Sequence, residues 1–435
     1  MSSLVINTAK VLGKIKPMNA VNNGPVKPAR SFSKHGNFED YKAAGIPFAR
    51  NHDASFFAYY GGERTVDINA IFRDFDADPY APESYDFACT DFYTQNIMEA
   101  GTEVFYRLGN KIDHRVKKYD SVPPKDFNKW AVICEHIIAH YNEGWADGFH
   151  YDIKYWEIWN EPENGPECWD GPFESFLDLF EITAKHLKAK FPYIKIGGPA
   201  FATIGIDRRR DDFLKYMKER NVPLDFFSWH TYRSEIAEYT KRIIAARKSL
   251  DDAGYTETES ILNEWTYVIN WHDGLHESVR TMLHIKGAAF VAANMLNSQN
   301  LPLDMLMYYD ARPSIFNCLF DFYTYDRLKG YYAFSLFSKL AALGKQVEAA
   351  CDADDVYVVA ASDGERSGVM MSYFTNDTEA VDKEIEIELA EGNATYKIIL
   401  LDETHDAECV GELVLDGKKA SLTISPNTVV YLEQA

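Results

Sequence analysis

Two glutamates follow asparagine at the ends of apolar runs, where packing gives no reason for a charge. Glu161 comes at the end of YWEIWNE, and Glu264 comes at the end of ESILNE. Burying a charge is costly unless a partner or a function compensates for it. Two carboxylates brought together are what cleavage of a glycosidic bond requires. The pair therefore predicts glycosidase chemistry.

The runs that end in these glutamates belong to a regular series. Amphipathic helical stretches alternate with eight short runs that are apolar on both faces, which is typical of parallel strands covered by helices. The series predicts an α/β fold, a (β/α)8 TIM barrel over residues 18–345. The expected strands are 18–22, 46–50, 103–108, 153–160, 194–198, 225–230, 260–265 and 304–309.

Two of the expected helices show a clear apolar face. Spacings of three and four residues place the apolar side chains of each on one stripe. The stripes are Phe173, Phe176, Leu177, Phe180, Ala184 and Leu187 in one helix, and Trp130, Cys134, Ile137 and Tyr141 in the other.

The two glutamates fall after the fourth strand and at the end of the seventh. Active sites of such barrels form at the C-terminal ends of the strands, and strands four and seven lie on opposite sides of an eight-stranded ring. We therefore expect Glu161 and Glu264 to face each other across the barrel mouth. The 51–86 segment after the second strand is expected to lie over this site, because long loops inside a compact domain are usually functional.

The C-terminal part of the chain has a different pattern. KEIEIEL at 383–389 alternates apolar and acidic residues with a period of two. Together with the strand-like runs after it, this predicts an antiparallel β-sandwich domain over 346–435, with Asp416-Gly417 as a hairpin turn. Residues 1–17 resemble a strand that joins this sandwich.

Charge and composition argue against several classes of binding partner. The net charge is −21, from 45 Lys and Arg against 66 Asp and Glu, which argues against nucleic acid or an anionic membrane surface. The six cysteines have no CxxC spacing and predict neither a zinc site nor a disulfide framework. The N-terminal residues lack the pattern of a secretory signal, and no apolar run is long enough to span a membrane. These features predict a cytoplasmic protein.

Several longer segments carry a resemblance to a known family. KYWEIWNEPEN at 154–164, DFFSWHTY at 225–232 and ILNEWTY at 261–267 resemble glycoside hydrolase family 39. RNHD at 50–53 and YRLG at 106–109 fit the same pattern, so the resemblance covers essentially the whole barrel.

The resemblance implies a retaining exo-glycosidase that needs no cofactor or metal and acts on a glycoside, most often a β-xyloside. An arabinoside, galactoside, glucoside or iduronide remains an alternative, as does a non-catalytic carbohydrate-binding barrel. Apart from Lys154 at the start of the first motif, no lysine lies directly beside the matched motifs, which favours a neutral sugar over a uronate. Family members are often oligomers, so a homo-oligomer is also compatible with the resemblance.

The same resemblance implies roles for single residues. Glu161 matches the acid/base and Glu264 the nucleophile. Arg50 is expected to be the cationic partner of Glu264, with an ion pair to Glu157 as the alternative. Asn160 is expected to bind the sugar 2-hydroxyl.

The expected sugar-binding residues lie at strand ends. His230 ends the sixth strand and matches the SWHTY motif, and His52 and Asp53 follow the second strand. Tyr232, Tyr267 and Tyr308 are candidate rim or platform residues, with ordinary packing at the top of the barrel as the alternative.

One pair of histidines has the spacing of metal ligands, but we do not predict a metal site there. His136 and His140 are four residues apart on a helix, but no glutamate follows the first histidine as a zinc protease motif requires. They fall off the apolar stripe, so we expect surface histidines here.

Overall fold

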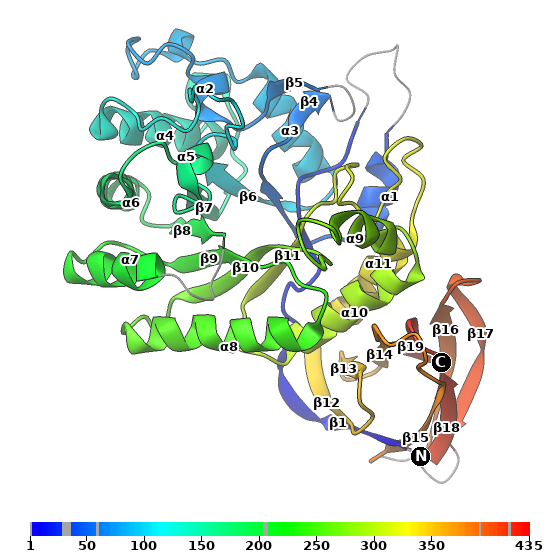
Figure 1. The fold of residues 1–435 in the computed structure, drawn as a ribbon. Coiled ribbons are helices and arrows are strands. Elements are labelled where there is room, and N and C mark those ends of the chain that lie inside the picture. The colour runs from blue at the N-terminus through cyan, green and yellow to red at the C-terminus, as the bar shows by residue number, and fades with distance from the viewer. Residues whose placement is uncertain (1, 28–35, 58–60, 203–207, 391–392, 416–418) are drawn as a thin grey trace.

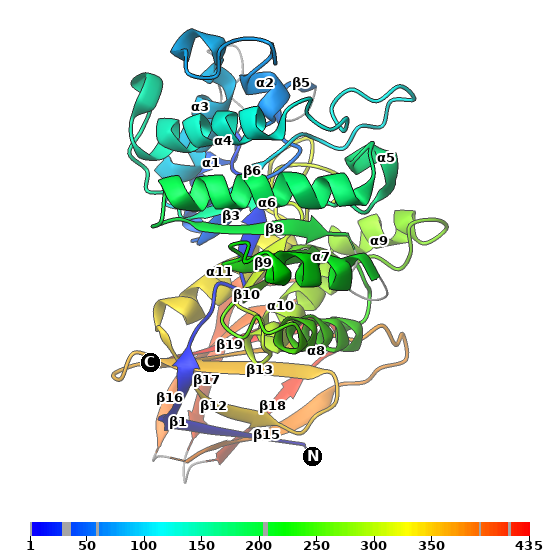
Figure 2. The ribbon, with the colours of Figure 1, turned by 90° about the vertical axis from the view of Figure 1, so that its left-hand side faces the viewer.

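The computed structural model describes residues 2–27, 36–57, 61–202, 208–390, 393–415 and 419–435. A barrel with surrounding helices forms one part, and a large sheet forms the other (Figure 1). Both chain ends lie in the sheet part, which is packed against one flank of the barrel in both views (Figures 1 and 2).

The barrel is closed by eight strands that run parallel to their neighbours, in the order β10-β11-β2-β3-β6-β7-β8-β9. The predicted (β/α)8 barrel is confirmed, and each of the eight expected strands overlaps an observed one. The strands are β2 Ala20–Asn22, β3 Phe48–Asn51, β6 Glu103–Leu108, β7 Tyr155–Ile158, β8 Lys195–Phe201, β9 Phe226–His230, β10 Glu259–Trp265 and β11 Met305–Tyr308.

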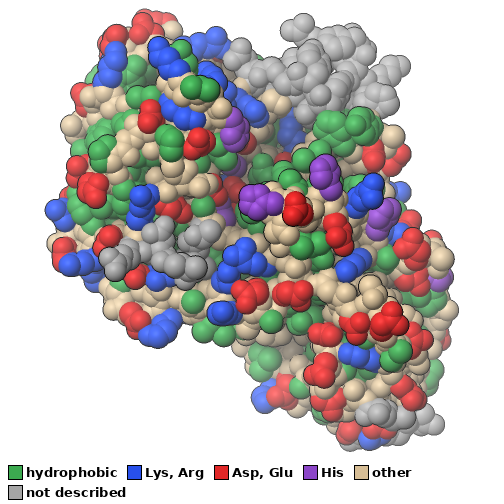
Figure 3. Space-filling model, viewed as in Figure 1, with side chains coloured by type: hydrophobic (Ala, Val, Ile, Leu, Met, Phe, Trp, Pro, Cys, Tyr) green, Lys and Arg blue, Asp and Glu red, His purple; other side chains and the backbone are tan. Residues whose placement is uncertain are grey.

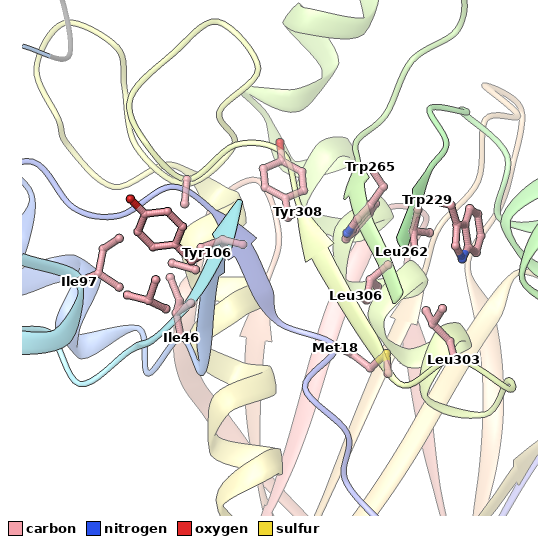
Figure 4. Close-up of a cluster of buried hydrophobic side chains, with 14 of the residues drawn as sticks. Met18, Ile46, Ile97, Tyr106, Trp229, Leu262, Trp265, Leu303, Leu306 and Tyr308 are labelled. Atoms are coloured by element: carbon pink, nitrogen blue, oxygen red, sulfur yellow. The ribbon is translucent and has the colours of Figure 1, made fainter. Parts of the chain in front are cut away.

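Helices surround the barrel, and buried side chains fill the space between them and the strands. Figure 4 shows part of this core, with Trp229, Leu262, Trp265, Leu306 and Tyr308 on neighbouring strands. The main helices are α1 Phe38–Ala43, α3 Ala88–Glu99, α4 Phe127–Asn142, α6 Phe173–Lys190, α7 Arg208–Glu219, α8 Ile236–Asp252, α9 Leu275–Met282, α10 Ile285–Gln299 and α11 Lys329–Ala342.

The predicted stripes lie on α4 and α6. All four stripe residues of α4 are buried, as are five of the six on α6, with Phe173 partly buried at its first position. The start of α4 is fixed by Asp126, whose carboxylate accepts hydrogen bonds from the backbone N–H groups of Asn128 and Lys129.

The prediction that His136 and His140 are surface residues is wrong. Their exposed fractions are only 9% and 2%. The His140 ring stacks on Phe87 with 3.6 Å between centroids, and its Nε2 lies 3.0 Å from Asp91 Oδ1. Segments from elsewhere in the chain cover this second face of α4, and the period of the helix alone does not reveal them.

The 51–86 segment contains short elements of its own. A hairpin of β4 Ser55–Phe57 and β5 Gly61–Arg64 is followed by α2 Ile68–Ile71 and by a 3-10 turn at Pro82–Ser84. Asp67 accepts a hydrogen bond from buried Arg107 of β6 at 2.9 Å. The segment is thereby fixed at the C-terminal end of a barrel strand.

The second part is one continuous nine-stranded sheet in the order β17-β16-β19-β14-β13-β12-β1-β15-β18. All its ladders are antiparallel except the parallel pair of β1 and β15. β17 also contacts β15 and β18, so the sheet curls until its two ends meet around a core. The strands are β1 Ser2–Lys14, β12 Lys345–Cys351, β13 Val356–Ser362, β14 Ser367–Tyr373, β15 Lys383–Leu389, β16 Ala394–Leu401, β17 Asp406–Leu415, β18 Lys419–Ile424 and β19 Thr428–Gln434.

The alternation at 383–389 corresponds to β15, in which Ile385, Ile387 and Leu389 are buried. The predicted turn at Asp416-Gly417 lies outside the described residues. Its flanking strands do not form a hairpin ladder in the described chain, because β17 pairs with β16 and β18 pairs with β15.

The two parts meet along α10, which lies between the barrel and the sheet (Figure 1). Almost every residue of α10 is buried, as expected for a helix covered on both sides. The Ser372 hydroxyl of β14 donates to the Ala289 carbonyl at 2.8 Å, and Phe374 packs on Phe290 with 5.2 Å between ring centroids. Across the described chain, no helix combines the length and hydropathy needed to cross a membrane.

Candidate active site

The structure brings the two predicted carboxylates together at the barrel mouth. Glu161 follows β7 and Glu264 lies in β10, and only 8% and 5% of their surfaces are exposed. One carboxylate oxygen from each and one ring nitrogen of His230 all lie within 4.8 Å of one another. On the face shown in Figure 3, histidine and acidic side chains gather near the middle, beside α9.

A sharp turn of the backbone directs Glu161 into this site. Trp159 and Glu161 have φ values of 72° and 48°, in the left-handed region that non-glycine residues rarely adopt. The turn is held by hydrogen bonds from Trp159 N to Leu108 O at 2.7 Å and from Glu161 N to Ala200 O at 3.0 Å. Neighbouring strands thus fix the position from which the carboxylate projects.

Several donors surround the Glu264 carboxylate. Arg50 Nη1 donates to Oε1 at 2.7 Å, and the Tyr232 hydroxyl donates to Oε2 at 2.6 Å. His52 Nε2 lies 3.4 Å from Oε1, and His230 Nδ1 lies 3.5 Å from Oε2. A guanidinium on one oxygen and a hydroxyl on the other fix the orientation of this carboxylate.

Arg50 is fully buried and serves both carboxylates that the sequence offered as alternatives. Its Nε donates to Glu157 Oε2 at 2.6 Å, in addition to the Nη1 bond to Glu264. Its Nη2 donates to Asn160 Oδ1 at 2.7 Å. Burial acts against the charge of the guanidinium, but Glu157 and Glu264 outweigh burial and raise the pKa of Arg50.

Glu157 accepts hydrogen bonds from several side chains of this network. It is fully buried, and its Oε1 accepts hydrogen bonds from Ser228 Oγ and from Asn263 Nδ2, both at 2.5 Å. With Arg50 on the other oxygen, the buried charge is paired and hydrogen-bonded. The sequence showed Glu157 only as an alternative partner of Arg50.

The Glu161 carboxyl has a different environment. Burial raises its pKa, and the opposing effects of Asn164, Arg50 and Cys168 do not cancel that rise. Asn164 Nδ2 donates to Oε2 at 3.0 Å, and His230 Nδ1 lies 2.7 Å from Oε1. Burial also lowers the pKa of His230 to about 4, so this ring is neutral near pH 7.

His52 and Asp53 lie next to this network. Burial and the charges of Arg50 and Arg107 hold the pKa of His52 well below its ordinary value, so the ring is neutral. Burial raises the pKa of Asp53, whose Oδ1 is buried and has no hydrogen bond among the described residues. The Asp53 carbonyl accepts a hydrogen bond from Arg64 at 2.7 Å.

Comparison with known families agrees with this geometry. The family model of glycosyl hydrolases family 39 matches residues 40–305, which is more than half of the chain. The chain belongs to glycosyl hydrolases family 39. The resemblance predicted from the barrel motifs is confirmed.

Individual family relatives are distant or cover only part of the chain. The β-xylosidase of Geobacillus stearothermophilus is 33% identical over 147 residues, which is 33% of this chain and 26% of that protein. The β-xylosidase of Caldicellulosiruptor saccharolyticus is 24% identical over 329 residues, which is 70% of this chain and 63% of that protein. The chain thus spans less than two thirds of the length of either curated relative.

Solved structures share the whole fold. The crystal structure of a glucosidase from Croceicoccus marinus aligns with a TM-score of 0.83 at 20% identity, over 100% of this chain and 99% of that one. At this identity the likeness establishes the barrel with its second domain and not the sugar.

Two residues of this family 39 chain that were predicted for the site, Tyr267 and Tyr308, make their hydrogen bonds outside the carboxylate network. The Tyr267 hydroxyl donates to Asn376 Oδ1 of the C-terminal sheet at 2.9 Å. Tyr308 is fully buried, its ring packs on Trp265 and Phe334, and its hydroxyl donates to Phe316 O at 2.7 Å. These contacts fit the alternative of ordinary packing at the top of the barrel, since the first tyrosine contacts the second domain and the second packs against α11.

Tyr309, the neighbour of Tyr308, was not predicted as a site residue. In β11 the side chains of Met305 and Met307 belong to the cluster inside the barrel, so the alternation of the strand predicts an inward Tyr309. The Tyr309 ring lies 6.4 Å from that of His52. Burial, Asp310 and Glu264 raise its pKa. The alternation of inward and outward side chains along the strand, continued into YYD at 308–310, was the signal in the sequence that could have identified Tyr309.

Trp271 was also missed as a rim residue. Its ring lies 5.1 Å from that of Tyr232, which contacts Glu264, and 49% of its surface is exposed. It belongs to the loop after β10, for which the family motifs give no pattern.

Proposed function

We propose that the protein is a retaining exo-glycosidase that removes a terminal β-xylosyl residue through a covalent glycosyl-enzyme. The observation that carries this proposal is the approach of the two carboxylates to within 4.8 Å at their nearest ligand atoms. Retaining enzymes hold the two groups about 5–5.5 Å apart, whereas inverting enzymes need about 6.5–9.5 Å to admit a water molecule. The observed proximity supports the retaining class.

In the first step the Glu264 carboxylate attacks the anomeric carbon and the bond to the leaving oxygen breaks. Hydrogen bonds from Arg50 and Tyr232 hold Glu264 in place for this attack. Glu161 gives its proton to the leaving oxygen. Burial raises the pKa of Glu161, which favours the proton being present at the start of the step.

In the second step Glu161, now ionised, takes a proton from water, the water oxygen bonds to the anomeric carbon, and the bond to Glu264 breaks. His230 is neutral and lies 2.7 Å from Glu161 Oε1. A neutral imidazole accepts a hydrogen bond at one nitrogen or donates one there, according to its tautomer. It therefore suits a carboxyl group that alternates between protonated and ionised forms.

Asn160 supports the proposed contact with the sugar 2-hydroxyl. Its Oδ1 is held by Arg50, while its Nδ2 is buried and has no hydrogen-bond partner among the described residues. Buried donors without a partner are rare, so a ligand atom is the natural acceptor. A hydrogen bond to the 2-hydroxyl strengthens in the transition state of this reaction.

A neutral xyloside is supported by two observations. The two relatives described above, from Geobacillus stearothermophilus and Caldicellulosiruptor saccharolyticus, are named β-xylosidases. The guanidinium of Arg50 is already shared between Glu157 and Glu264, so it offers no excess positive charge to a uronate. Exo action is proposed from the same relatives.

Replacing Glu264 by alanine tests the chemistry. We expect hydrolysis of nitrophenyl β-xyloside to fall by at least about 10⁴-fold, as when other covalent nucleophiles are removed. Azide added to this variant is expected to yield an α-glycosyl azide, because it attacks from the side that the carboxylate occupied. A variant that keeps its activity would remove Glu264 from the mechanism.

Nitrophenyl glycosides of several sugars test the substrate separately. The wild-type protein is expected to have its highest kcat/KM on the β-xyloside in a panel with arabinosides, galactosides, glucosides and iduronides. A preference for another member would replace the proposed sugar and leave the mechanism intact.

A further inference from the structure

The side chain of Asn376, in the C-terminal sheet domain, contacts two loops at the barrel mouth. Asn376 follows β14, and its Nδ2 donates to Ser234 O at 3.0 Å and to Glu235 Oε1 at 2.7 Å. Its Oδ1 accepts the hydroxyl of Tyr267 at 2.9 Å. The loops after β9 and β10 are therefore both tied to one amide of the other domain.

The first of these loops contacts the proposed nucleophile, which lies near the end of β10, the strand that leads into the second loop. Tyr232, two residues before Ser234, donates to Glu264 Oε2 at 2.6 Å. The loops are also tied to each other, since Thr231 N donates to Glu264 O at 3.1 Å and Val268 N donates to Arg233 O at 3.3 Å. A shift of the first loop therefore moves the Tyr232 hydroxyl relative to the carboxylate.

The two residues before Asn376 make contacts within the C-terminal domain and with α10. Thr375 N donates to Asn427 Oδ1 at 3.2 Å, and the buried Phe374 packs on Phe290 of α10. Burial, with the charges of Glu235 and Glu277, raises the pKa of Tyr267 to about 12, so its hydroxyl remains a donor at neutral pH. The amide is thus fixed from both sides.

We propose that Asn376 is a positioning residue for the nucleophile, through which the C-terminal sheet holds the Tyr232 hydroxyl on Glu264. This inference rests on the proposed function of Glu264. Catalytic groups are sensitive to small displacements, and a misplacement of about 1 Å can lower a rate by about 10²-fold. The second domain is accordingly part of the catalytic apparatus, although it supplies no group to the reaction.

Kinetics of Asn376→Ala test the inference, with Asn393→Ala as a matched control on an exposed residue just before β16. We expect kcat of Asn376→Ala to fall roughly 2- to 30-fold with little change in KM. The control is expected to match wild type. An unchanged kcat in Asn376→Ala would overturn the inference.

Coupling to Tyr232 separates positioning from general destabilisation. In a Tyr232→Phe background, Asn376→Ala is expected to lower kcat by less than about twofold, because residues acting through one contact are not additive. Combining Asn376→Asp with Glu235→Gln replaces the lost donor with one on the other side, and is expected to recover part of the kcat that Asn376→Ala loses. Full additivity with Tyr232→Phe would overturn the inference.

Hydrogen exchange gives a readout that needs no substrate. Peptides over 231–235 and 265–268 are expected to exchange faster in Asn376→Ala than in wild type, while peptides over β3 and β6 stay unchanged. Equal exchange in all of them would overturn the inference whatever the protein hydrolyses. Loss of the proposed function would show instead in the Glu264→Ala assay, which does not depend on Asn376.

Discussion

The two carboxylates of the site share a burial level but differ in their partners. Glu264 has a guanidinium on one oxygen and a hydroxyl on the other. Glu161 has an amide and a neutral imidazole, and burial raises its pKa. The contrast fits the two proposed roles, since Glu264 is paired with a guanidinium while burial helps Glu161 keep its proton.

After the loss of Glu264, removing the proposed proton donor should give the largest effect. Glu161→Gln is expected to lower kcat/KM by about 10²- to 10⁴-fold on an alkyl xyloside, whose leaving oxygen needs a proton. A dinitrophenyl xyloside, which needs little protonation, should lose much less in the first step. Burst kinetics on the two substrates check this. Equal losses on both would contradict the assignment of Glu161 as the acid.

Removing the shared cation should affect both activity and stability. Arg50→Met leaves Glu157 and Glu264 without their cation, so we expect kcat/KM to fall by two to three orders of magnitude and the free energy of unfolding to fall by about 3–5 kcal/mol. Denaturant titration and steady-state kinetics measure the two effects.

The double variant Arg50→Met with Glu157→Gln provides the control. It is expected to recover much of the stability, because one buried charge is gone, but little of the activity, because Glu264 still lacks its donor. Recovery of activity in the double variant would show that Arg50 acts only on Glu157.

A smaller change should appear in the pH profile. Asn164 donates to the ionised form of Glu161, so Asn164→Ala should raise the pKa of this carboxyl further. Activity that needs protonated Glu161 is present below its pKa and is lost as pH rises through it. The alkaline limb of kcat/KM is therefore expected to move up by about half to one pH unit. A downward shift would contradict the assignment.

The sequence was sufficient for the barrel and the carboxylate pair because both depend on local patterns. A strand buried on both faces is a continuous apolar run, and a charge at its end is conspicuous, as at Glu161 and Glu264. The sequence was less informative about which face of a strand a side chain occupies and about contacts between distant segments. Tyr308 and Tyr309 are adjacent, and successive side chains of a strand point to opposite faces. An error of one residue therefore exchanges the inward and the outward side chain. Asn376 and His140 depend on contacts with segments far away in the chain.

The stereochemistry of hydrolysis tests the central claim most directly. Proton NMR during the first minutes of reaction on a β-xyloside distinguishes the anomers of the released sugar before they equilibrate. The proximity of Glu161 and Glu264 predicts that the β-anomer appears first, with the α-anomer rising only by later mutarotation. Initial release of the α-anomer would contradict a covalent intermediate on Glu264.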